Sequence, residues 1–311
     1  MNILVKDHYC GEALARLNEI EDIRLTHSTD LQLSDTELEE TEILLIRSGT
    51  KLPQEVLAKT ERLRFIVTAT SGFDHIDLVY CEHARIKVAH TPDANRDGVA
   101  ELTMMLMLNS IRHSRESSQS IEANSWRSVV PRGHTLAGKR LGIVGLGRVG
   151  SRVAELARGF KMNVAAFDPY QDDEQFARYG VDRMDYTELL AHSHIVTYHV
   201  PLTNETRHMV NHETLSFVSE DAIIINTCRG EVVDERELYR ALKEHEIAAA
   251  GLDVFEEEPL PEASPLRHLP NVTMTPHVGA YTYESVSTAS HLAVQDVFLF
   301  LENKAIPSLL V

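Results

Sequence analysis

Cysteine is scarce in this chain and follows no recognisable spacing. Its 311 residues include three cysteines, Cys10, Cys81 and Cys228, which lie far apart and form no CxxC pair. An odd, scattered set argues against a disulfide framework and is typical of a reducing compartment. His, Cys, Asp and Glu also form no cluster with the spacing of a metal site. We therefore predict a cytoplasmic protein with no bound metal.

Long apolar runs and an excess of positive charge are absent too. The longest apolar stretches, such as TMMLML, fall far short of the ~20 residues needed to cross a bilayer. The start, MNILVKDHYC, lacks the basic and apolar regions of a secretory signal. Lys and Arg number 30 against 47 Asp and Glu, a formal net charge of −17. This balance argues against nucleic acid and anionic membranes as partners, because both require clustered cations.

What the chain does contain is a regular alternation of strand-like and helix-like segments. NILVK, EILLIRSG, LRFIVTATSG and IKVAHTP read as strands, and GEALARLNEI as an amphipathic helix. One long helix is expected over 99–117, apolar on nearly every side through Leu108, and a second alternating unit begins at Lys139. Alternating strands and helices favour parallel sheets. The sequence therefore predicts an α/β protein with two domains.

The stretch LGIVGLGRVGSRVAEL contains a dinucleotide-binding fingerprint in its full context. Gly145, Gly147 and Gly150 follow an apolar strand and open a helix, whose N-terminus suits phosphates. Asp168 ends the next strand, 18 residues after Gly150. Its carboxylate can accept from the adenosine ribose and would repel a 2′-phosphate, so NAD is predicted over NADP. The predicted loop consists of Gly145, Gly147, Arg148, Val149 and Gly150.

Ionisable residues follow three later strands. INTCRGEVVDE carries Arg229, AGLDVFEEEPLPE carries Asp253 and three successive glutamates, and MTPHVGAYT carries His277. In open parallel sheets, ligands bind outside the carboxyl ends of the strands. We therefore expect these groups to face the nicotinamide end of the cofactor.

The patterns NTCRG, GLDVFEEEP and PHVGA resemble the D-isomer-specific 2-hydroxyacid dehydrogenase family, and the resemblance extends over essentially the whole chain. It implies that Arg229 holds the substrate carboxylate and that Glu258 orients and charges His277. His277 would then be the acid/base. The chemistry is reasonable, because a keto acid receives a hydride and a proton, and histidine exchanges protons near neutral pH. Arginine offers a planar fork of donors that matches a carboxylate.

The same resemblance assigns the first 140 residues. It implies two Rossmann-like parallel-sheet domains, with an NAD-binding domain (99–284) inserted into a flavodoxin-like substrate domain (1–98 and 285–311). In TATSGFDHID, Ser71 and Gly72 would bind the substrate carboxylate through backbone N–H groups. The long apolar helix would help to form a homodimer. Further cofactor contacts are implied for Thr103, His199, Pro201, Thr206, Thr227, Cys228, Asp253 and Gly279.

The substrate stays open at this point. LLIRSGTKL, ANSWRS and GHTLAGKRLGIVGLGRVG are most similar to phosphoglycerate dehydrogenases, in which case Arg47, Arg127 or Arg132 would meet a phosphate. Many of those enzymes carry C-terminal regulatory domains, which are not expected in a chain that ends at Val311. Hydroxypyruvate and glyoxylate reductases and erythronate-4-phosphate dehydrogenases share the core motifs. An NAD(H)-sensing corepressor of the same family is an alternative from another functional class.

Overall fold

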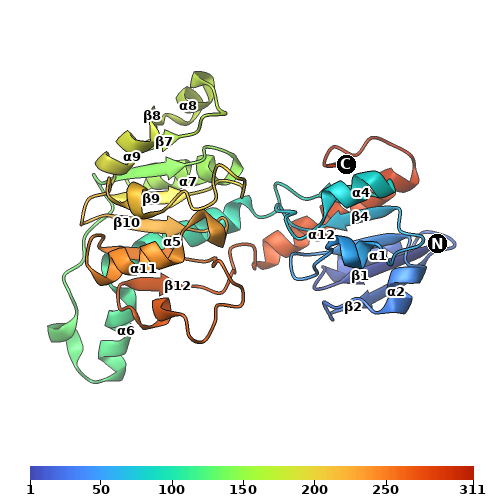
Figure 1. Ribbon diagram of the computed structural model, residues 1–311, viewed down its shortest axis with the longest axis horizontal. Coiled ribbons are helices and arrows are strands. Elements are labelled where there is room, and N and C mark those ends of the chain that lie inside the picture. Colours follow the sequence, from blue (N-terminus) through green and yellow to red (C-terminus); the bar gives the residue numbers. More distant parts are fainter. The chain divides into compact units, whose positions relative to one another are not determined.

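The computed structural model describes residues 1–311, which divide into two compact units (Figure 1). Unit 1 combines Met1–Asn95 with Ala280–Val311, and unit 2 is the intervening segment Arg96–Gly279. Each unit is built on one parallel sheet with helices on both faces. The predicted fold class, one parallel-sheet α/β domain inserted into another, is confirmed.

Unit 1 contains a five-stranded parallel sheet in the order β2-β1-β3-β4-β5, the flavodoxin-like arrangement. Its central strands β3 and β4, ILLI and FIVT, are buried at every residue, as expected of parallel strands covered on both faces. The strands are β1 (Asn2–Lys6), β2 (Arg24–Ser28), β3 (Ile43–Ile46), β4 (Phe65–Thr68) and β5 (Lys87–His90). The helices are α1 (Gly11–Leu17), α2 (Asp35–Glu40), α3 (Gln54–Leu57), α4 (Leu78–Ala84) and α12 (Tyr283–Leu301).

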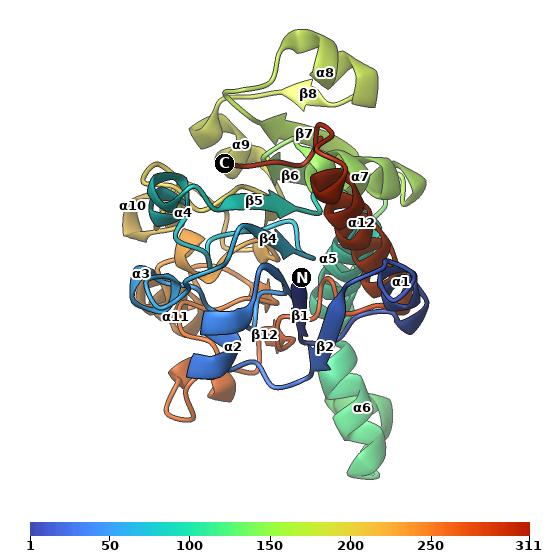
Figure 2. The same ribbon diagram turned by 90° about the vertical axis from the view of Figure 1, so that its right-hand side faces the viewer.

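Helices α1 and α12 lie side by side on one face of the unit 1 sheet (Figure 1, Figure 2). Ala289 and Ala293, four residues apart, are buried on α12, so small side chains let this helix pack closely on the sheet. Side chains of α3 and α4 fill the other face. The chain's last residues pair with β5, where Leu310 N donates to Val88 O at 2.7 Å. The C-terminal segment is therefore part of unit 1.

Unit 2 contains a seven-stranded parallel sheet in the order β12-β11-β10-β9-β6-β7-β8. From β8 through β11, this is the 3-2-1-4-5-6 order of Rossmann domains, and β12 adds a further edge strand. The strands are β6 (Arg140–Val144), β7 (Asn163–Phe167), β8 (Asp182–Arg183), β9 (Ile195–Tyr198), β10 (Ile223–Asn226), β11 (Ala249–Leu252) and β12 (Val272–Met274).

Helices cover both faces of the unit 2 sheet. One face packs against α5, α7 and α8, and the other against α9, α10 and α11. The helices are α5 (Arg96–Arg112), α6 (Ser114–Glu122), α7 (Arg148–Gly159), α8 (Asp173–Tyr179), α9 (Tyr186–His192), α10 (His212–Leu215) and α11 (Glu235–Lys243), with short 3-10 turns η1 (Trp126–Val129), η2 (Gly230–Val232) and η3 (Pro265–His268). No helix of the protein combines the length and apolarity that a membrane span requires.

One sequence-based expectation about the fold was wrong. The single helix predicted over 99–117 is broken at His113, which has a left-handed backbone (φ 50°) and separates α5 from α6. The break allows α6 to leave the sheet and project from the body of unit 2 (Figure 1, Figure 2). The apolar positions of α5 pack on α7, β10 and β11, which explains why this helix is apolar on several sides.

Candidate active site

The glycine loop connects β6 to α7 in unit 2. Gly145 has φ +93°, a conformation that favours glycine, and Gly147 is the N-cap of α7. A Cβ on Gly150 would lie 1.9 Å from the Gly145 carbonyl oxygen, so the loop and helix approach too closely for any side chain. A Cβ on Gly147, in contrast, would meet no protein atom within 4 Å. Gly150 therefore serves the protein's own packing, whereas the space at Gly147 is open.

Asp168 follows β7 and is tied to this loop. Its Oδ2 accepts from Leu146 N at 2.8 Å, and its Oδ1 accepts from Tyr170 N at 3.0 Å. Each carboxylate oxygen has two lone pairs, so capacity remains for hydroxyl donors of a ligand. Of the loop's other members, Arg148 begins α7 and Val149 packs on the core beneath it.

The segment after β9 carries three more predicted cofactor residues. Thr206 Oγ1 donates to Pro201 O at 2.6 Å and closes a tight loop. The His199 carbonyl packs against Gly145, and its ring Nε2 lies 3.0 Å from Thr197 Oγ1. Its Nδ1 is buried without a partner, and burial lowers the pKa of His199 to about 3. This ring is therefore uncharged at neutral pH.

His277 and Glu258 come together although 19 positions separate them in sequence. His277 Nδ1 lies 2.7 Å from Glu258 Oε2, and Glu258 Oε1 accepts from Phe255 N at 3.1 Å. The two side chains are 40% and 36% exposed, so the imidazole is held by a carboxylate and still open to a ligand. A proton on Nδ1 that points at Glu258 leaves Nε2 to exchange the other proton.

Asp253, at the end of β11, anchors the loop that carries His277. Its buried carboxylate accepts from Thr275 Oγ1 at 2.6 Å and from Val278 N and Gly279 N, both at 2.9 Å. Burial raises the pKa of Asp253, and these three hydrogen bonds oppose the rise. The carboxylate thus already has a role in the protein alone, which its sequence motif did not reveal.

Arg229 lies in the loop after β10. The side chain of the buried Asn226 holds one end of this loop, and a close backbone contact at Gly230 holds the other. Asn226 Nδ2 donates to Arg229 O at 2.8 Å, and Asn226 Oδ1 accepts from Cys228 N at 3.1 Å. A Cβ on Gly230 would lie 1.9 Å from the carbonyl carbon and oxygen of Phe255. The arginine loop therefore packs directly on the segment that leads to Glu258. Sequence reasoning missed Asn226, although it is the first residue of the N-x-x-R-G pattern.

Of the remaining predicted cofactor residues, Thr227 and Cys228 lie in the arginine loop, Thr103 contacts Thr227, and Gly279 lies in the loop that carries His277. Thr103 of α5 and Thr227 after β10 are buried, with their hydroxyl oxygens 3.0 Å apart. Cys228 is half-buried, and burial raises the pKa of its thiol. A Cβ on Gly279 would lie 3.1 Å from Asp253 Oδ2, so this position also favours a residue without a side chain.

Three predicted substrate residues, Arg47, Ser71 and Gly72, follow strands of unit 1, whereas Arg127, Arg132 and Arg229 belong to unit 2. Ser71 Oγ lies 2.8 Å from Pro92 O, and His90 Nδ1 lies 2.9 Å from Ser71 O, so the Ser71–Gly72 turn is fixed from two sides. The Arg47 guanidinium, after β3, makes no hydrogen bond or ion pair, and its Nη1 is buried. Arg127 and Arg132 are exposed in the segment that follows α6.

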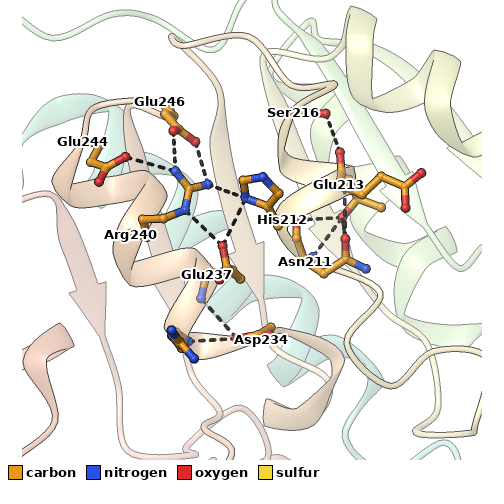
Figure 3. Close-up of polar contacts among 11 residues, drawn as sticks. Asn211, His212, Glu213, Ser216, Asp234, Glu237, Arg240, Glu244 and Glu246 are labelled. Atoms are coloured by element: carbon orange, nitrogen blue, oxygen red, sulfur yellow. Dashed lines mark hydrogen bonds and ion pairs between the residues drawn. The ribbon is translucent and has the colours of Figure 1, made fainter.

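A further charged cluster joins α10 to α11 and contains none of the predicted site residues (Figure 3). Arg240 donates to Glu237 at 3.0 Å, to Glu244 at 3.1 Å and to Glu246, and also contacts His212. Hydrogen bonds to these carboxylates, that to Glu246 above all, raise the pKa of Arg240. Because the acids share this one cation, the cluster is structural and fastens the two helices together.

The fold and the geometry of the glycine loop define a dinucleotide-binding α/β protein, with an imidazole–carboxylate pair at the strand ends of its Rossmann domain. Residues 104–279 match the model for the D-isomer specific 2-hydroxyacid dehydrogenase, NAD binding domain. The chain belongs to the D-isomer-specific 2-hydroxyacid dehydrogenase family.

Individual relatives differ in their named activities. The chain is 38% identical to a D-3-phosphoglycerate dehydrogenase of Methanocaldococcus jannaschii over 96% of its own length and 57% of that protein, so it spans little more than half of that relative. It is 36% identical to a hydroxypyruvate reductase of Thermotoga maritima over 83% of the chain and 84% of the relative. A D-lactate dehydrogenase of Aquifex aeolicus, solved with NAD and lactic acid, superposes with a TM-score of 0.86 at 31% identity, covering 97% of this chain and 96% of the other.

Proposed function

We propose that the protein interconverts a D-2-hydroxy acid and its 2-keto acid with NAD(H) as the hydride carrier. The 2.7 Å pair of His277 and Glu258, beside the Arg229 loop of a Rossmann domain, carries this proposal. In the reducing direction, His277 would give a proton to the carbonyl oxygen of the substrate, and bound NADH would supply the hydride that C2 accepts. Glu258 holds the imidazole through Nδ1, so that Nε2 carries the exchanged proton. Arg229 binds the substrate carboxylate through its planar fork of donors.

We infer that NAD is bound along the carboxyl edge of unit 2, with its pyrophosphate at Gly147 and the N-terminus of α7. The open space at Gly147 supports this placement. Asp168 receives the adenosine ribose hydroxyls and selects NAD over NADP. The further contacts are made by Thr103, Arg148, Val149, His199, Pro201, Thr206, Thr227, Cys228, Asp253 and Gly279.

We infer that unit 1 is the substrate domain, with the Ser71–Gly72 turn facing the substrate carboxylate. The buried Arg47 Nη1, which has no hydrogen-bond partner in the protein, favours a substrate with a second anionic group, such as a phosphorylated 2-keto acid. A partly buried guanidinium without a carboxylate partner is costly, and the protein has 47 acidic residues that could have supplied one. An anionic group of a ligand would offset this cost by pairing with the guanidinium.

The decisive assay follows NADH oxidation against a panel of 2-keto acids. The panel contains 3-phosphohydroxypyruvate, 2-keto-3-hydroxy-4-phosphobutyrate, hydroxypyruvate, glyoxylate and pyruvate, and His277→Ala is the control. We expect turnover of a phosphorylated member, its loss in the control, and a raised KM for that member in Arg47→Ala. Tight NADH binding with no turnover of any member would contradict the proposal and favour an NAD(H)-sensing protein.

We further propose that the protein is a homodimer whose interface includes the apolar helix predicted to form it, now α5, and continues through α6 to η1. Ile121, Trp126 and Val129 are 57%, 72% and 61% exposed on this projecting segment, so an interface here would bury apolar side chains that otherwise lie in water. Sedimentation velocity checks the state, and Trp126→Glu is expected to yield monomers. A cytoplasmic location stays a prediction of the sequence, which cell fractionation tests.

A further inference from the structure

Two loops of unit 2 are joined by a hydrogen bond that the proposed chemistry does not use. Tyr170, two residues past Asp168, donates its phenolic O–H to Glu205 Oε2 at 2.5 Å. Tyr170 follows β7, and Glu205 follows β9. These strands are the two neighbours of β6 in the sheet. The bond therefore links the loops on either side of the glycine loop that β6 carries.

Each partner is anchored next to a residue that we assign to the cofactor. Tyr170 N donates to Asp168 Oδ1 at 3.0 Å. Glu205 N donates to Thr203 Oγ1 at 3.2 Å, in the tight loop that Thr206 closes. These hydrogen bonds thus fix the backbone at both Tyr170 and Glu205.

This contact does little for folding. Tyr170 is 77% exposed and packs into neither core cluster of unit 2. A hydrogen bond between exposed groups adds little to stability, because water would satisfy both partners. The position of this hydrogen bond beside Asp168, rather than its effect on stability, therefore indicates its role.

Two carboxylates act on the same phenol. The hydrogen bond to Glu205 and the charge of Glu205 raise the pKa of Tyr170, and the charge of Asp168 adds to the rise. The phenol is thus within electrostatic reach of both acids. A 2′-phosphate brings close to two further negative charges into this region, whereas a ribose hydroxyl brings none.

We propose that Glu205, positioned by Tyr170, is a second selectivity carboxylate that rejects the 2′-phosphate of NADP(H) together with Asp168. The proposal rests on the placement of the adenosine ribose at Asp168 given above. Tyr170 is a positioning residue in this scheme, because its hydroxyl holds the Glu205 carboxylate in place.

The test measures Kd for NADH and NADPH by fluorescence titration at low and at high salt. Glu205→Gln keeps the size of the side chain and removes its charge. We expect its NADPH Kd to fall about 5- to 10-fold, the scale for one charge against a phosphate several ångströms away in a solvated site. The NADH Kd should change by less than about 2-fold, and the gain for NADPH should shrink at high salt.

Matched variants separate the possible causes. Glu213→Gln removes an exposed carboxylate elsewhere in unit 2 and should leave the ratio of the NADPH Kd to the NADH Kd unchanged. Tyr170→Phe keeps the ring and should lower the ratio by a smaller factor, with no further effect when Glu205→Gln is already present.

Two outcomes would overturn the inference. An unchanged ratio in Glu205→Gln, while Asp168→Asn lowers it, would leave Asp168 as the selecting acid and remove Glu205. Equal effects of Glu213→Gln and Glu205→Gln would show that only net charge matters. Failure of the wild type to bind either nucleotide would instead overturn the cofactor placement itself.

Discussion

Gly230→Ala is expected to disable catalysis with little effect on cofactor binding. The added Cβ would lie 1.9 Å from the carbonyl carbon and oxygen of Phe255 and 2.4 Å from Glu256 N. All three atoms are backbone, so no side chain can rotate away. Moving from 1.9 Å to ordinary contact at 3.4 Å requires the two segments to separate by roughly 1.5 Å. One segment carries Arg229, and the other leads to Glu258.

A misplacement of ~1 Å in a catalytic group costs on the order of 100-fold in rate. We therefore expect kcat/KM for the accepted keto acid to fall about 100-fold. The NADH Kd should rise by a much smaller factor, because the glycine loop and Asp168 are not displaced and, of the proposed cofactor contacts, Thr227 and Cys228 lie in the shifted loop. Overpacking should also cost about 1–3 kcal/mol of unfolding free energy, seen as a lower Tm in calorimetry.

The control is Gly159→Ala near the end of α7, where a Cβ would meet nothing within 4 Å. It should match the wild type in kcat/KM, and its Tm should be equal or slightly higher, because alanine favours a helix more than glycine does. If Gly230→Ala retained wild-type kcat/KM, the packing of the arginine loop on Phe255 would not set the catalytic geometry, and the reasoning would fail.

Three further predictions concern the cofactor loop, pH and the substrate anchor. Gly147→Ala should keep the Tm of the wild type and lose NADH affinity. Gly150→Ala should lower Tm, because its Cβ would meet a backbone oxygen at 1.9 Å. Calorimetry and NADH titration separate the two variants, and equal behaviour of both would refute the distinction. Because the pKa of His199 is about 3 in the folded protein, below the ordinary ~6.5, the unfolded chain binds the proton first. Stability should therefore fall as pH drops below ~6.5, by about 2 kcal/mol at pH 5, and urea unfolding of His199→Asn should show a correspondingly weaker pH dependence. Arg229→Ala should lower kcat/KM by about 1.5–3 kcal/mol of transition-state stabilisation, roughly 10- to 150-fold, and a near-wild-type value would exclude Arg229 from the mechanism.

The features that could be predicted are those in which a local pattern has one physical solution. IVGLG and the spacing to Asp168 require a strand, a tight turn and a helix, and the structure has β6, the loop and α7 in that order. Fully apolar runs such as ILLI became the central strands, because only a sheet covered on both faces buries them completely.

The features that escaped prediction depend on tertiary contacts. β2 has no fully buried residue, and both residues of β8 are exposed, so their sequences carry no apolar signal. The break at His113 follows from a left-handed residue that no helix-period pattern reveals. Glu205 acts through Tyr170, 35 positions away, which only the folded chain brings near it.

The His277 loop shows why its residues belong together. His277 has a left-handed backbone (φ 53°), which costs a non-glycine residue about 1–2 kcal/mol. Asp253 offsets this cost: its carboxylate accepts from the two N–H groups that follow His277, and its carbonyl accepts from His277 N at 2.8 Å. The turn that results aims the imidazole at Glu258. A buried carboxylate that is expensive to desolvate is thus kept because it fixes the direction of the side chain that would transfer the proton.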